Sequence, residues 1–430
     1  MLRTWSEITP LIKCLFDNAP VRALRRPVPA RTVQAVALPA VPSFADVPSL
    51  ADVLQALDGW YPPSTAESWD AVGLTCGDPA AQVERILLAV DCVPATVAEA
   101  VESGAQLLVT HHPLLLSGVH GVPATDPKGG LVHRMIRAGV AHFVAHTNAD
   151  VATDGVSQAL ARCLELGAIA PLAPDPAPPL DHLTVYVPSE DCDRLIAALT
   201  EAGAGTVGNY DRCTFTVPGQ GSYRPLPGAD PADGEIGVLT RKTEQALSVV
   251  LPRHRRSAVL AAMRQAHPYE EVAFTLTEQP RLDAATGTGR IGVLAEPMTL
   301  RDFTGYVAAR LPGTAWGVRA AGRPEQLVRT VAVCGGSGAS YTELARARGA
   351  DAYLTSDLKH HSTVEAVTER AAEGAAGGDD AAPMALVDAA HWATEWPWLP
   401  VAADLVRRRF GDVEVSVSEV VTDPWTVHAG

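Results

Sequence analysis

Short apolar runs alternate with amphipathic stretches from residue 49 onward, and this alternation dominates the first part of the chain. Uninterrupted apolar runs predict strands that are buried on both faces, whereas amphipathic stretches predict helices. The predicted strands are 85–90, 106–110 and 141–145, and the predicted helices are 49–57, 94–103 and 130–138. Because strands that alternate with helices usually pair in parallel, the pattern indicates an α/β domain with a mostly parallel sheet.

A Pro-rich stretch around 171–180 interrupts this pattern and predicts a stiff linker. The texture then changes, with strands expected at 182–187, 212–217, 237–239 and 271–276 and helices at 191–202 and 256–266. This β-α-β-β-α-β order is typical of a ferredoxin-like α+β unit. After a Gly-rich segment at 287–294 the α/β pattern resumes, with strands expected at 328–334, 352–355 and 384–388.

The simplest architecture is one α/β domain in two sequence halves, 45–170 and 281–430, interrupted by an inserted α+β module over 181–280. Residues 1–44 do not share the pattern, because Arg22–Pro29 is basic and broken by proline. No apolar core and cleavage site of a secretory signal follow it. We expect residues 1–44 to be a disordered extension or the result of a start codon assigned too early, with a targeting peptide as the alternative.

Composition acts mainly by exclusion. The chain has 430 residues, 47% of them hydrophobic and 19% charged, which is globular and long enough for more than one domain. A formal net charge of −15 argues against a general nucleic-acid or anionic-membrane surface, and no apolar run is long enough to span a membrane. The seven cysteines are scattered, which favours reduced thiols in the cytoplasm and makes cysteine ligation of a metal unlikely.

Two pairs of polar residues carry the candidate chemistry. His111 and His112 follow an apolar strand directly, at the edge of the sheet where ligands bind in open α/β folds. His391 and Glu395 are four residues apart, so that a helical turn places both on one face. Imidazole and carboxylate groups are good ligands for Zn, Fe or Mn, and two distant pairs suggest one metal centre closed by the fold.

Other polar strand ends leave alternatives open. Asp150 either caps a helix or acts as a ligand that bridges two metals. Asp357 and His361 follow another strand, and a pocket role competes with a capping role there. Gly335–Gly338 could cradle an anion with backbone amides, although such turns are common after strands. A helix is expected to begin near His391, with Pro397 in its early turns.

Together these motifs resemble one family, the dinuclear-metal proteins labelled GTP cyclohydrolase 1 type 2 homologues, also called Nif-three-like. The similarity spans about residues 48–425. It rests on Trp69-Asp70-Ala71-Val72-Gly73-Leu74, Thr110-His111-His112-Pro113, His146-Thr147-Asn148-Ala149-Asp150, Leu354–His361 and His391–Glu395. Ala71, Ala390 and Trp392 depart from the usual residues, and none of them is a ligand. The module at 181–280 resembles the PII-like insertion of longer members through Gly208–Phe215, Pro218–Gly221 and His267–Val272.

The resemblance implies a Nif-three-like fold and two divalent metal ions per subunit, held by His111, His112, Asp150, His391 and Glu395. It also implies a homohexameric ring and a small-molecule substrate, possibly a nucleotide. The family label suggests hydrolytic opening of a guanine imidazole ring with loss of formate, in which His361 or Asp357 would shuttle protons. A metal-dependent phosphoesterase is a related alternative. A metallochaperone-like or regulatory adaptor without enzymatic activity is a different one.

Overall fold

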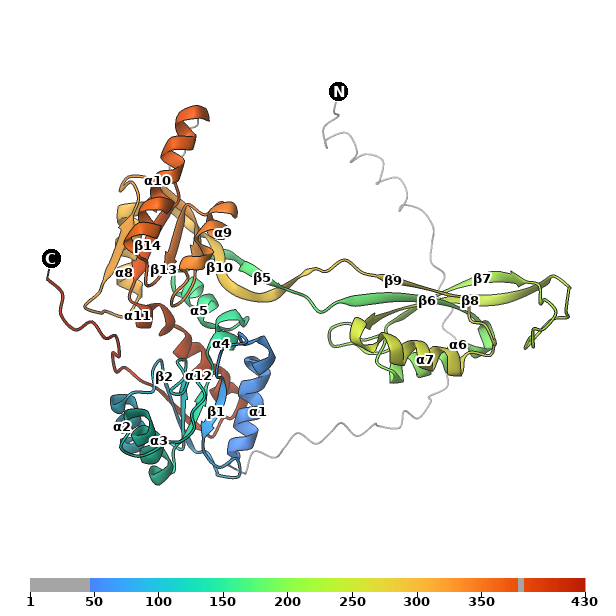
Figure 1. Cartoon of the computed structure of the whole chain (residues 1–430), viewed down its shortest axis with the longest axis horizontal. Coiled ribbons are helices and arrows are strands. Elements are labelled where there is room, and N and C mark those ends of the chain that lie inside the picture. The colour runs from blue at the N-terminus through green and yellow to red at the C-terminus, as the bar shows by residue number, and fades with distance from the viewer. Residues whose placement is uncertain (1–46, 378–382, 430) are drawn as a thin grey trace, which may run out of the picture. The chain divides into compact units, whose positions relative to one another are not determined.

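The structure is a computed structural model that describes residues 47–377 and 383–429 (Figure 1). The prediction for residues 1–44 lies outside these residues. The fold class is α/β, as predicted, and the strands of the described residues form three sheets. Each half of the α/β domain contributes mainly to its own sheet, and the third sheet belongs to the inserted segment.

The first sheet is mostly parallel and comes almost entirely from the first half of the chain. Its order is β1 (Gly73–Cys76), β4 (Ala141–Val144), β3 (Leu107–Thr110), β2 (Arg85–Ala89) and β15 (Glu414–Val417). Only the pair β1–β4 is antiparallel. The strand β15 comes from the C-terminal end of the chain, and it therefore ties the second sequence half to the first sheet.

Helices cover both faces of this sheet, which explains why its strands read as continuous apolar runs. In β2, Ile86 and Leu88 belong to a core that also contains α1 (Leu50–Trp60), α5 (Val156–Cys163) and α12 (Trp398–Arg409). Leu87 and Ala89 point into a second core, formed with α2 (Pro94–Glu102) and α3 (Pro127–Ala138). The alternation of side chains along a strand thus serves two hydrophobic layers.

The second sheet is mixed and belongs mainly to the second half. Its order is β11 (Val318–Ala321), β14 (Ala385–Ala389), β13 (Ala352–Thr355), β12 (Leu327–Val333), β10 (Asp283–Thr299) and β5 (Gly167–Pro176). The three strands β12, β13 and β14 are parallel to one another. Three helices of this half are α8 (Leu300–Arg310), α9 (Thr342–Ala347) and α10 (His360–Gly377).

The Pro-rich segment that we expected to be a linker at 171–180 is largely the edge strand β5. It pairs with β10 in antiparallel register, with Pro171 opposite Arg290 and Pro174 opposite Gly287. An edge strand tolerates proline because the missing amide would otherwise face away from the sheet. Composition alone therefore misled the prediction. Gly287 has a φ of 146°, and a Cβ there would lie 2.2 Å from the Ala173 carbonyl oxygen, so this pairing requires glycine.

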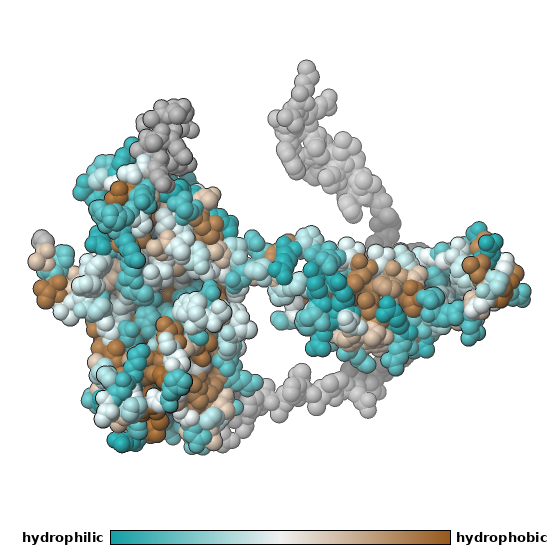
Figure 2. All heavy atoms as spheres, in the orientation of Figure 1, coloured by the Kyte–Doolittle hydropathy of each residue, from teal (hydrophilic) through white to brown (hydrophobic). Residues whose placement is uncertain are grey.

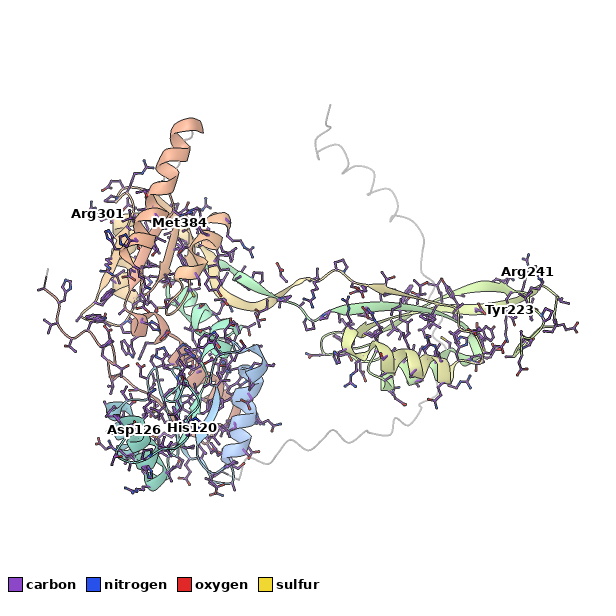
Figure 3. The ribbon with its side chains drawn as sticks, in the orientation of Figure 1. His120, Asp126, Tyr223, Arg241, Arg301 and Met384 are labelled. Carbon is purple, nitrogen blue, oxygen red and sulfur yellow. The ribbon has the colours of Figure 1, made fainter. Side chains whose placement is uncertain are left out.

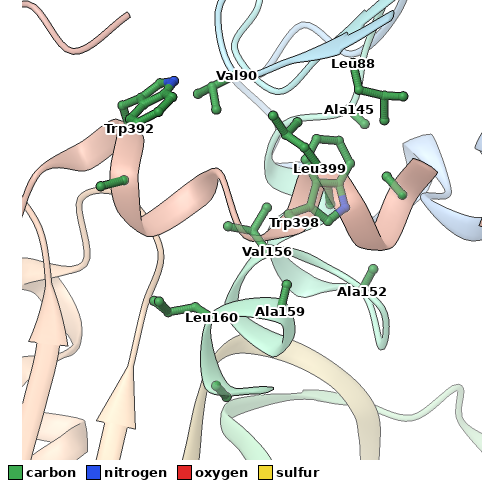
Figure 4. Packing of buried hydrophobic residues seen from close by; sticks show 14 of the residues in the cluster. Leu88, Val90, Ala145, Ala152, Val156, Ala159, Leu160, Trp392, Trp398 and Leu399 are labelled. Atoms are coloured by element: carbon green, nitrogen blue, oxygen red, sulfur yellow. The ribbon is translucent and has the colours of Figure 1, made fainter. Parts of the chain in front are cut away.

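A buried tryptophan connects the two halves of the domain (Figure 4). Trp398 lies at the start of α12 and is fully buried beside Val156 of α5, and its indole N–H donates a 3.0 Å hydrogen bond to the Tyr61 hydroxyl. The expectation that Pro397 lies in the early turns of one helix was wrong. The short helix α11 (His391–Glu395) ends before it, and Pro397 is the N-cap of α12, where its missing amide costs no hydrogen bond.

The inserted segment has the predicted β-α-β-β-α-β order. Its elements are β6 (Leu180–Pro188), α6 (Cys192–Glu201), β7 (Thr214–Tyr223), β8 (Thr240–Pro252), α7 (Arg256–Ala266) and β9 (Phe274–Glu278). Its antiparallel sheet has the order β7-β8-β6-β9. The strand predicted at 237–239 is wrong in position, because the observed strand begins at Thr240 and extends to Pro252. Its polar first half hid it from a search for apolar runs.

Two sequence-based expectations about the chain's environment can be compared with the structure. In residues 47–377 and 383–429, every helix is too short or too polar to cross a lipid bilayer. The six cysteines in the same residues are free thiols.

The short helix α4 (Thr147–Val151) follows β4 and places Asp150 close to His111 at the end of β3.

Arg290 of β10 fastens the two halves of the α/β domain from inside. Its side chain is 1% exposed. The guanidinium donates hydrogen bonds to the carbonyl oxygens of Gly287, Gly289 and Ala152, at 2.6–2.7 Å, and to the Gln158 side chain at 2.7 Å. Ala152 and Gln158 belong to the first half of the chain, so these bonds stabilise the junction between the halves.

Replacing this guanidinium should destabilise the fold. We expect Arg290→Met to lower the free energy of unfolding by about 3 kcal/mol, because buried carbonyl oxygens lose their donors. Arg329→Met, on an exposed position of β12, is the matched control and should change it by less than about 0.5 kcal/mol. Urea denaturation followed by circular dichroism measures both. Equal effects of the two variants would contradict the role of Arg290.

The buried side chain of His142 in β4 should make the free energy of unfolding depend on pH. Thr110 donates its hydroxyl hydrogen to the His112 carbonyl, so its oxygen accepts the His142 Nε2–H at 2.8 Å. Burial lowers the pKa of His142 to about 4, and its Nδ1 has no hydrogen-bond partner among the described residues. His142 is therefore protonated below about pH 6.5 in the unfolded state but only below about pH 4 in the folded state.

Stability contributed by neutral His142 should thus be complete above the unfolded-state pKa and be lost as the pH falls toward 4. Between pH 7 and 4.5 the free energy of unfolding should fall by about 2 kcal/mol more in the unmodified protein than in His142→Gln. Urea titrations at both pH values test this difference. Parallel pH profiles for the two proteins would show that His142 is not buried in its neutral form.

Candidate metal centre

Polar side chains at the ends of three strands converge in the fold. His111 and His112 follow β3, His146 follows β4, and His391 follows β14 by two residues. The centroid of the His112 ring lies 5.0 Å from that of His111, 5.6 Å from that of His146 and 5.2 Å from that of His391. The two sheets therefore bring their strand ends to one place, as the predicted single centre requires.

Glu395 lies in the middle of these rings. Its carboxylate is 3% exposed, and its Oε1 is 2.9 Å from His391 Nε2 and 3.4 Å from His111 Nε2. Its Oε2 is 3.1 Å from His112 Nε2. The spacing of four residues puts His391 and Glu395 on one face of α11, so that a local helical turn builds half of this arrangement.

The adjacent rings of His111 and His112 are each held from behind. His111 Nδ1 donates to the Ala145 carbonyl oxygen at 2.9 Å, and His112 Nδ1 donates to Asp91 Oδ1 at 2.7 Å. Because both acceptors are oxygens without a proton to give, Nδ1 carries the hydrogen in each ring. The Nε2 atoms are therefore the ones presented to Glu395. Both rings therefore converge on one carboxylate where the strand ends.

The other two histidines are oriented in the same way. His146 Nδ1 donates to Asp70 Oδ1 at 2.8 Å, and His391 Nδ1 donates to Asp357 Oδ2 at 2.7 Å. Asp70 is itself fixed by the backbone N–H of Thr147 at 3.0 Å. Such outer hydrogen bonds set the tautomer and the direction of metal-binding imidazoles in known sites. All four rings thus have Nε2 available for a cation.

The donor atoms of these side chains are close enough together to bind a metal ion. Two groups in these residues have ligand atoms within 4.8 Å of one another: His111, His112 and His146, and His112, His391 and Glu395. Asp150 Oδ1 is buried without a hydrogen-bond partner in the described part of the chain, and Glu395 Oε2 has none unless His112 carries a proton on Nε2. Buried carboxylate oxygens without donors are costly, and a cation would satisfy them.

The pKa values show that this site favours positive charge. Burial lowers the pKa of His391, but the attraction of Glu395 outweighs it and raises the pKa to about 9. Burial raises the pKa of Glu395, but His112, His391 and His111 outweigh it and hold the pKa well below its usual range. Burial also raises the pKa of Asp150, to about 6. The rings next to Glu395 would therefore carry protons where a metal ion could supply the charge instead.

The Gly-rich turn after β12 supports the site rather than cradling an anion. Gly336 has a φ of 65°, and a Cβ there would lie 2.4 Å from Glu395 Oε1. The Gly336 amide donates to the Thr394 hydroxyl at 2.9 Å, and the Gly338 amide donates to the Thr355 hydroxyl at 2.8 Å. These amides are therefore occupied. Glycine is needed here because α11 approaches the turn closely.

The two side chains predicted to transfer protons lie in different places. Asp357 is exposed and reaches the centre through its hydrogen bond to His391. His361 is exposed near the start of α10, and its ring lies 5.3 Å from that of His360. Among the described contacts, none joins His361 to the histidine and carboxylate side chains of the centre.

Three side chains of the site were not predicted: His146, and the carboxylates of Asp70 and Asp91, which orient the rings of His146 and His112. His146 follows strand β4 as His111 follows β3, so its place at a strand end was a usable signal. Asp70 belongs to the motif Trp69-Asp70-Ala71-Val72-Gly73-Leu74, in which no residue was predicted to act in the site. Asp91 comes two residues after β2 and contacts His112 only through the parallel pairing of β2 and β3, which the sequence does not show.

A pocket of about 290 Å³ opens beside the centre and includes His112 and His391 in its wall. Trp316 and Trp425 form another part of the wall, with ring centroids 5.5 Å apart. Asp423, near the C-terminal end, also lines it and has a buried Oδ2 without a hydrogen-bond partner among the described residues. The centre therefore has an accessible side with aromatic and acidic character.

Removing the central carboxylate should remove the metal. We expect Glu395→Gln to lose most of the metal bound by protein purified without added metal or chelator, because it lies against three of the four rings. His361→Ala is the control and should keep its metal. Elemental analysis by mass spectrometry gives the metal content, and circular dichroism verifies that both variants fold. Unchanged metal in Glu395→Gln would show that the metal, if any, binds elsewhere.

Comparison with known proteins identifies the family of this chain. A sequence model of the Duf34/NIF3 (NGG1p interacting factor 3) family matches residues 48–424. A Mycobacterium tuberculosis protein named GTP cyclohydrolase 1 type 2 homolog is 47% identical over 380 residues, which cover 88% of this chain and 97% of the relative. A Bacillus subtilis protein of the same name is 35% identical over 378 residues, 87% of this chain and 97% of the relative.

Solved structures show the same fold. A Bacillus cereus protein related to NIF3 is similar with a TM-score of 0.64 and 31% sequence identity, over 89% of this chain and 99% of that protein. A Staphylococcus aureus protein is similar with a TM-score of 0.71 and 27% identity, over 88% of this chain and 98% of that protein. On the family match and these relatives together, the chain belongs to the DUF34/NIF3 family.

Proposed function

We propose that this chain is a metal-dependent hydrolase that opens the ring of a purine nucleotide. The observation that carries the proposal is the buried donor set around Glu395, in which the Nε2 atoms of three histidines lie 2.9–3.4 Å from one carboxylate. The name GTP cyclohydrolase 1 type 2 homolog, borne by relatives that match most of this chain, supports this class of reaction.

Six side chains would hold the metal: His111, His112, His146, Asp150, His391 and Glu395. Imidazole and carboxylate donors without cysteine suit Zn, Fe or Mn. Divalent ions held there would supply Lewis-acid activation of water and substrate. The presence of two ions per subunit is part of the proposal, supported by the two overlapping groups of ligand atoms.

The pocket beside the centre favours a planar group with N–H donors. Trp316 is held by its indole N–H, which donates to Asp388 at 3.2 Å, and by the Arg319 guanidinium 4.4 Å from its ring centroid. With Trp425 it offers aromatic faces on which a nucleobase could stack. The unpartnered Oδ2 of Asp423 could accept a hydrogen bond from a ring N–H.

The same pocket makes phosphoester hydrolysis the weaker proposal. Asp91, Asp357 and Asp423 all line it, and their carboxylates would repel a phosphate placed directly against the centre. We therefore place the nucleobase, and not the phosphates, in this pocket. Asp357 acts here as a positioning residue for His391. A proton-transfer role for His361 remains a prediction, with no contact to the centre that supports it.

Turnover of GTP tests this function. Metal-loaded protein should release formate from GTP, and Glu395→Gln should not. Trp425→Ala should raise KM about tenfold with little change in kcat, because it removes stacking that substrate and transition state share. Tyr210→Ala, at an exposed position of the inserted segment, is the control and should leave KM unchanged. A coupled formate dehydrogenase assay measures the product.

Other results would favour other functions. Release of phosphate from GTP or from bis-p-nitrophenyl phosphate, without formate, would replace the proposal with a phosphoesterase. Metal that binds and exchanges readily without any turnover would favour a metallochaperone-like adaptor. The homohexameric ring and the PII-like character of the insertion also remain proposals. Analytical ultracentrifugation of the full chain can test the hexamer.

A further inference from the structure

A cavity of about 540 Å³ lies in the inserted segment and is separate from the residues of the metal centre. Its lining comes from β6, β7 and β8, from the connection after β7, and from the segment that follows α7. Figure 3 labels Tyr223, one of its lining residues, on β7 next to Arg241 of β8. The volume falls in the range of small-molecule sites, roughly 300–1,000 Å³.

The register of β7 and β8 explains why this cavity exists. The helices α6 and α7 cover the face of the sheet to which Leu247 and Val249 point. Glu244 lies opposite Gly219, with Gly221 two residues further along β7. Both glycines belong to the motif Pro218–Gly221. Because they carry no side chains, the space around the Glu244 carboxylate stays open.

Glu244 is the unusual group in this cavity. It is 8% exposed, and its Oε1 accepts a 2.9 Å hydrogen bond from the Tyr269 hydroxyl. No ion pair to Glu244 occurs among the described residues. A carboxylate buried beside apolar and aromatic side chains without a cation is costly, so the structure leaves a place for positive charge.

The neighbouring basic groups do not provide this charge. Lys242 pairs with Glu190 and Asp233, both at 3.2 Å. His267 receives the Tyr269 backbone N–H on Nδ1, while its Nε2 donates to the Tyr186 carbonyl, and burial lowers its pKa. It is therefore neutral.

The rim is acidic on balance. Glu270 and Glu271 line the cavity together with a single guanidinium, that of Arg224, whose side chain is exposed. Tyr223 and Tyr269 contribute aromatic rings with centroids 5.7 Å apart. Carboxylates combined with aromatic faces are the usual environment for organic cations. Figure 2 shows hydrophobic side chains exposed on the inserted segment.

We propose that this cavity binds a small organic cation, a guanidinium or primary ammonium compound of metabolite size, whose nitrogen pairs with Glu244 beside the rings of Tyr223 and Tyr269. This is a binding function distinct from hydrolysis at the metal centre. The motifs Pro218–Gly221 and His267–Val272 thereby acquire a shared role, because both contribute to the wall of one cavity.

Calorimetric titration of the full chain with butylguanidinium and with its neutral counterpart butylurea tests the charge requirement. We expect saturable binding of butylguanidinium and at least about tenfold weaker binding of butylurea, the margin typical of a charged hydrogen bond. Affinity should be the same with and without EDTA, which separates this site from the metal centre. Equal affinity for both compounds, or no binding of either, overturns the proposal.

Two variants locate the binding. Glu244→Gln should weaken butylguanidinium at least about tenfold, whereas the exposed Glu201→Gln of α6 should not change it. Gly219→Leu gives an independent check, because Gly219 lines the cavity opposite Glu244 and a Cβ there meets no atom within 4 Å, so that the added side chain would occupy the cavity. It should abolish binding in a folded protein. Unchanged affinity in both variants would overturn the assignment. A second result would also overturn the assignment: Glu244→Gln loses self-association, and butylguanidinium does not disrupt self-association of the unmodified protein. The positive charge that pairs with Glu244 would then come from another copy of the chain.

Discussion

The buried carboxylate of Glu395 is the constraint on which the rest of the structure depends. It lies among the Nε2 atoms of His111, His112 and His391, out of contact with water, and such a group is stable only if positive charge is close. The surrounding architecture is organised to provide that charge in one place. Each ring is held from behind by an oxygen acceptor, so that a cation, whether a proton or a metal ion, always meets the same nitrogen atoms.

This requirement explains why the chain crosses between its two halves several times. The rings of His111 and His112 come from the first sheet, whereas His391 and Glu395 follow β14 of the second. The strand β15 and the helix α12 return to the first half, and Trp398 packs 5.6 Å from the His111 ring. Precise placement of these four side chains therefore depends on the hydrophobic junction between the halves, and the site and the core are stabilised together.

Much of this arrangement could be predicted from local patterns. The runs 85–90, 106–110 and 141–145 are buried strands because a short, continuous apolar run is stable only when both of its faces are covered. Histidines that follow parallel strands of one sheet then lie at the same edge of that sheet. The i,i+4 spacing of His391 and Glu395 was equally local. The sequence could not show contacts that depend on pairing, such as Asp91 with His112 or Asp70 with His146. It also misled where position overrides composition, since prolines in β5 are tolerated only because β5 is an edge strand.

Anomalous X-ray scattering from crystals of the full chain grown with Mn or Zn tests the central claim most directly. We expect anomalous peaks bounded by the Nε2 atoms of His111, His112, His146 and His391 and by the carboxylates of Asp150 and Glu395, with every Nδ1 still bonded to its oxygen acceptor. Peaks coordinated through Nδ1, or a Glu395 carboxylate that remains paired only with protonated rings in metal-soaked crystals, would contradict it.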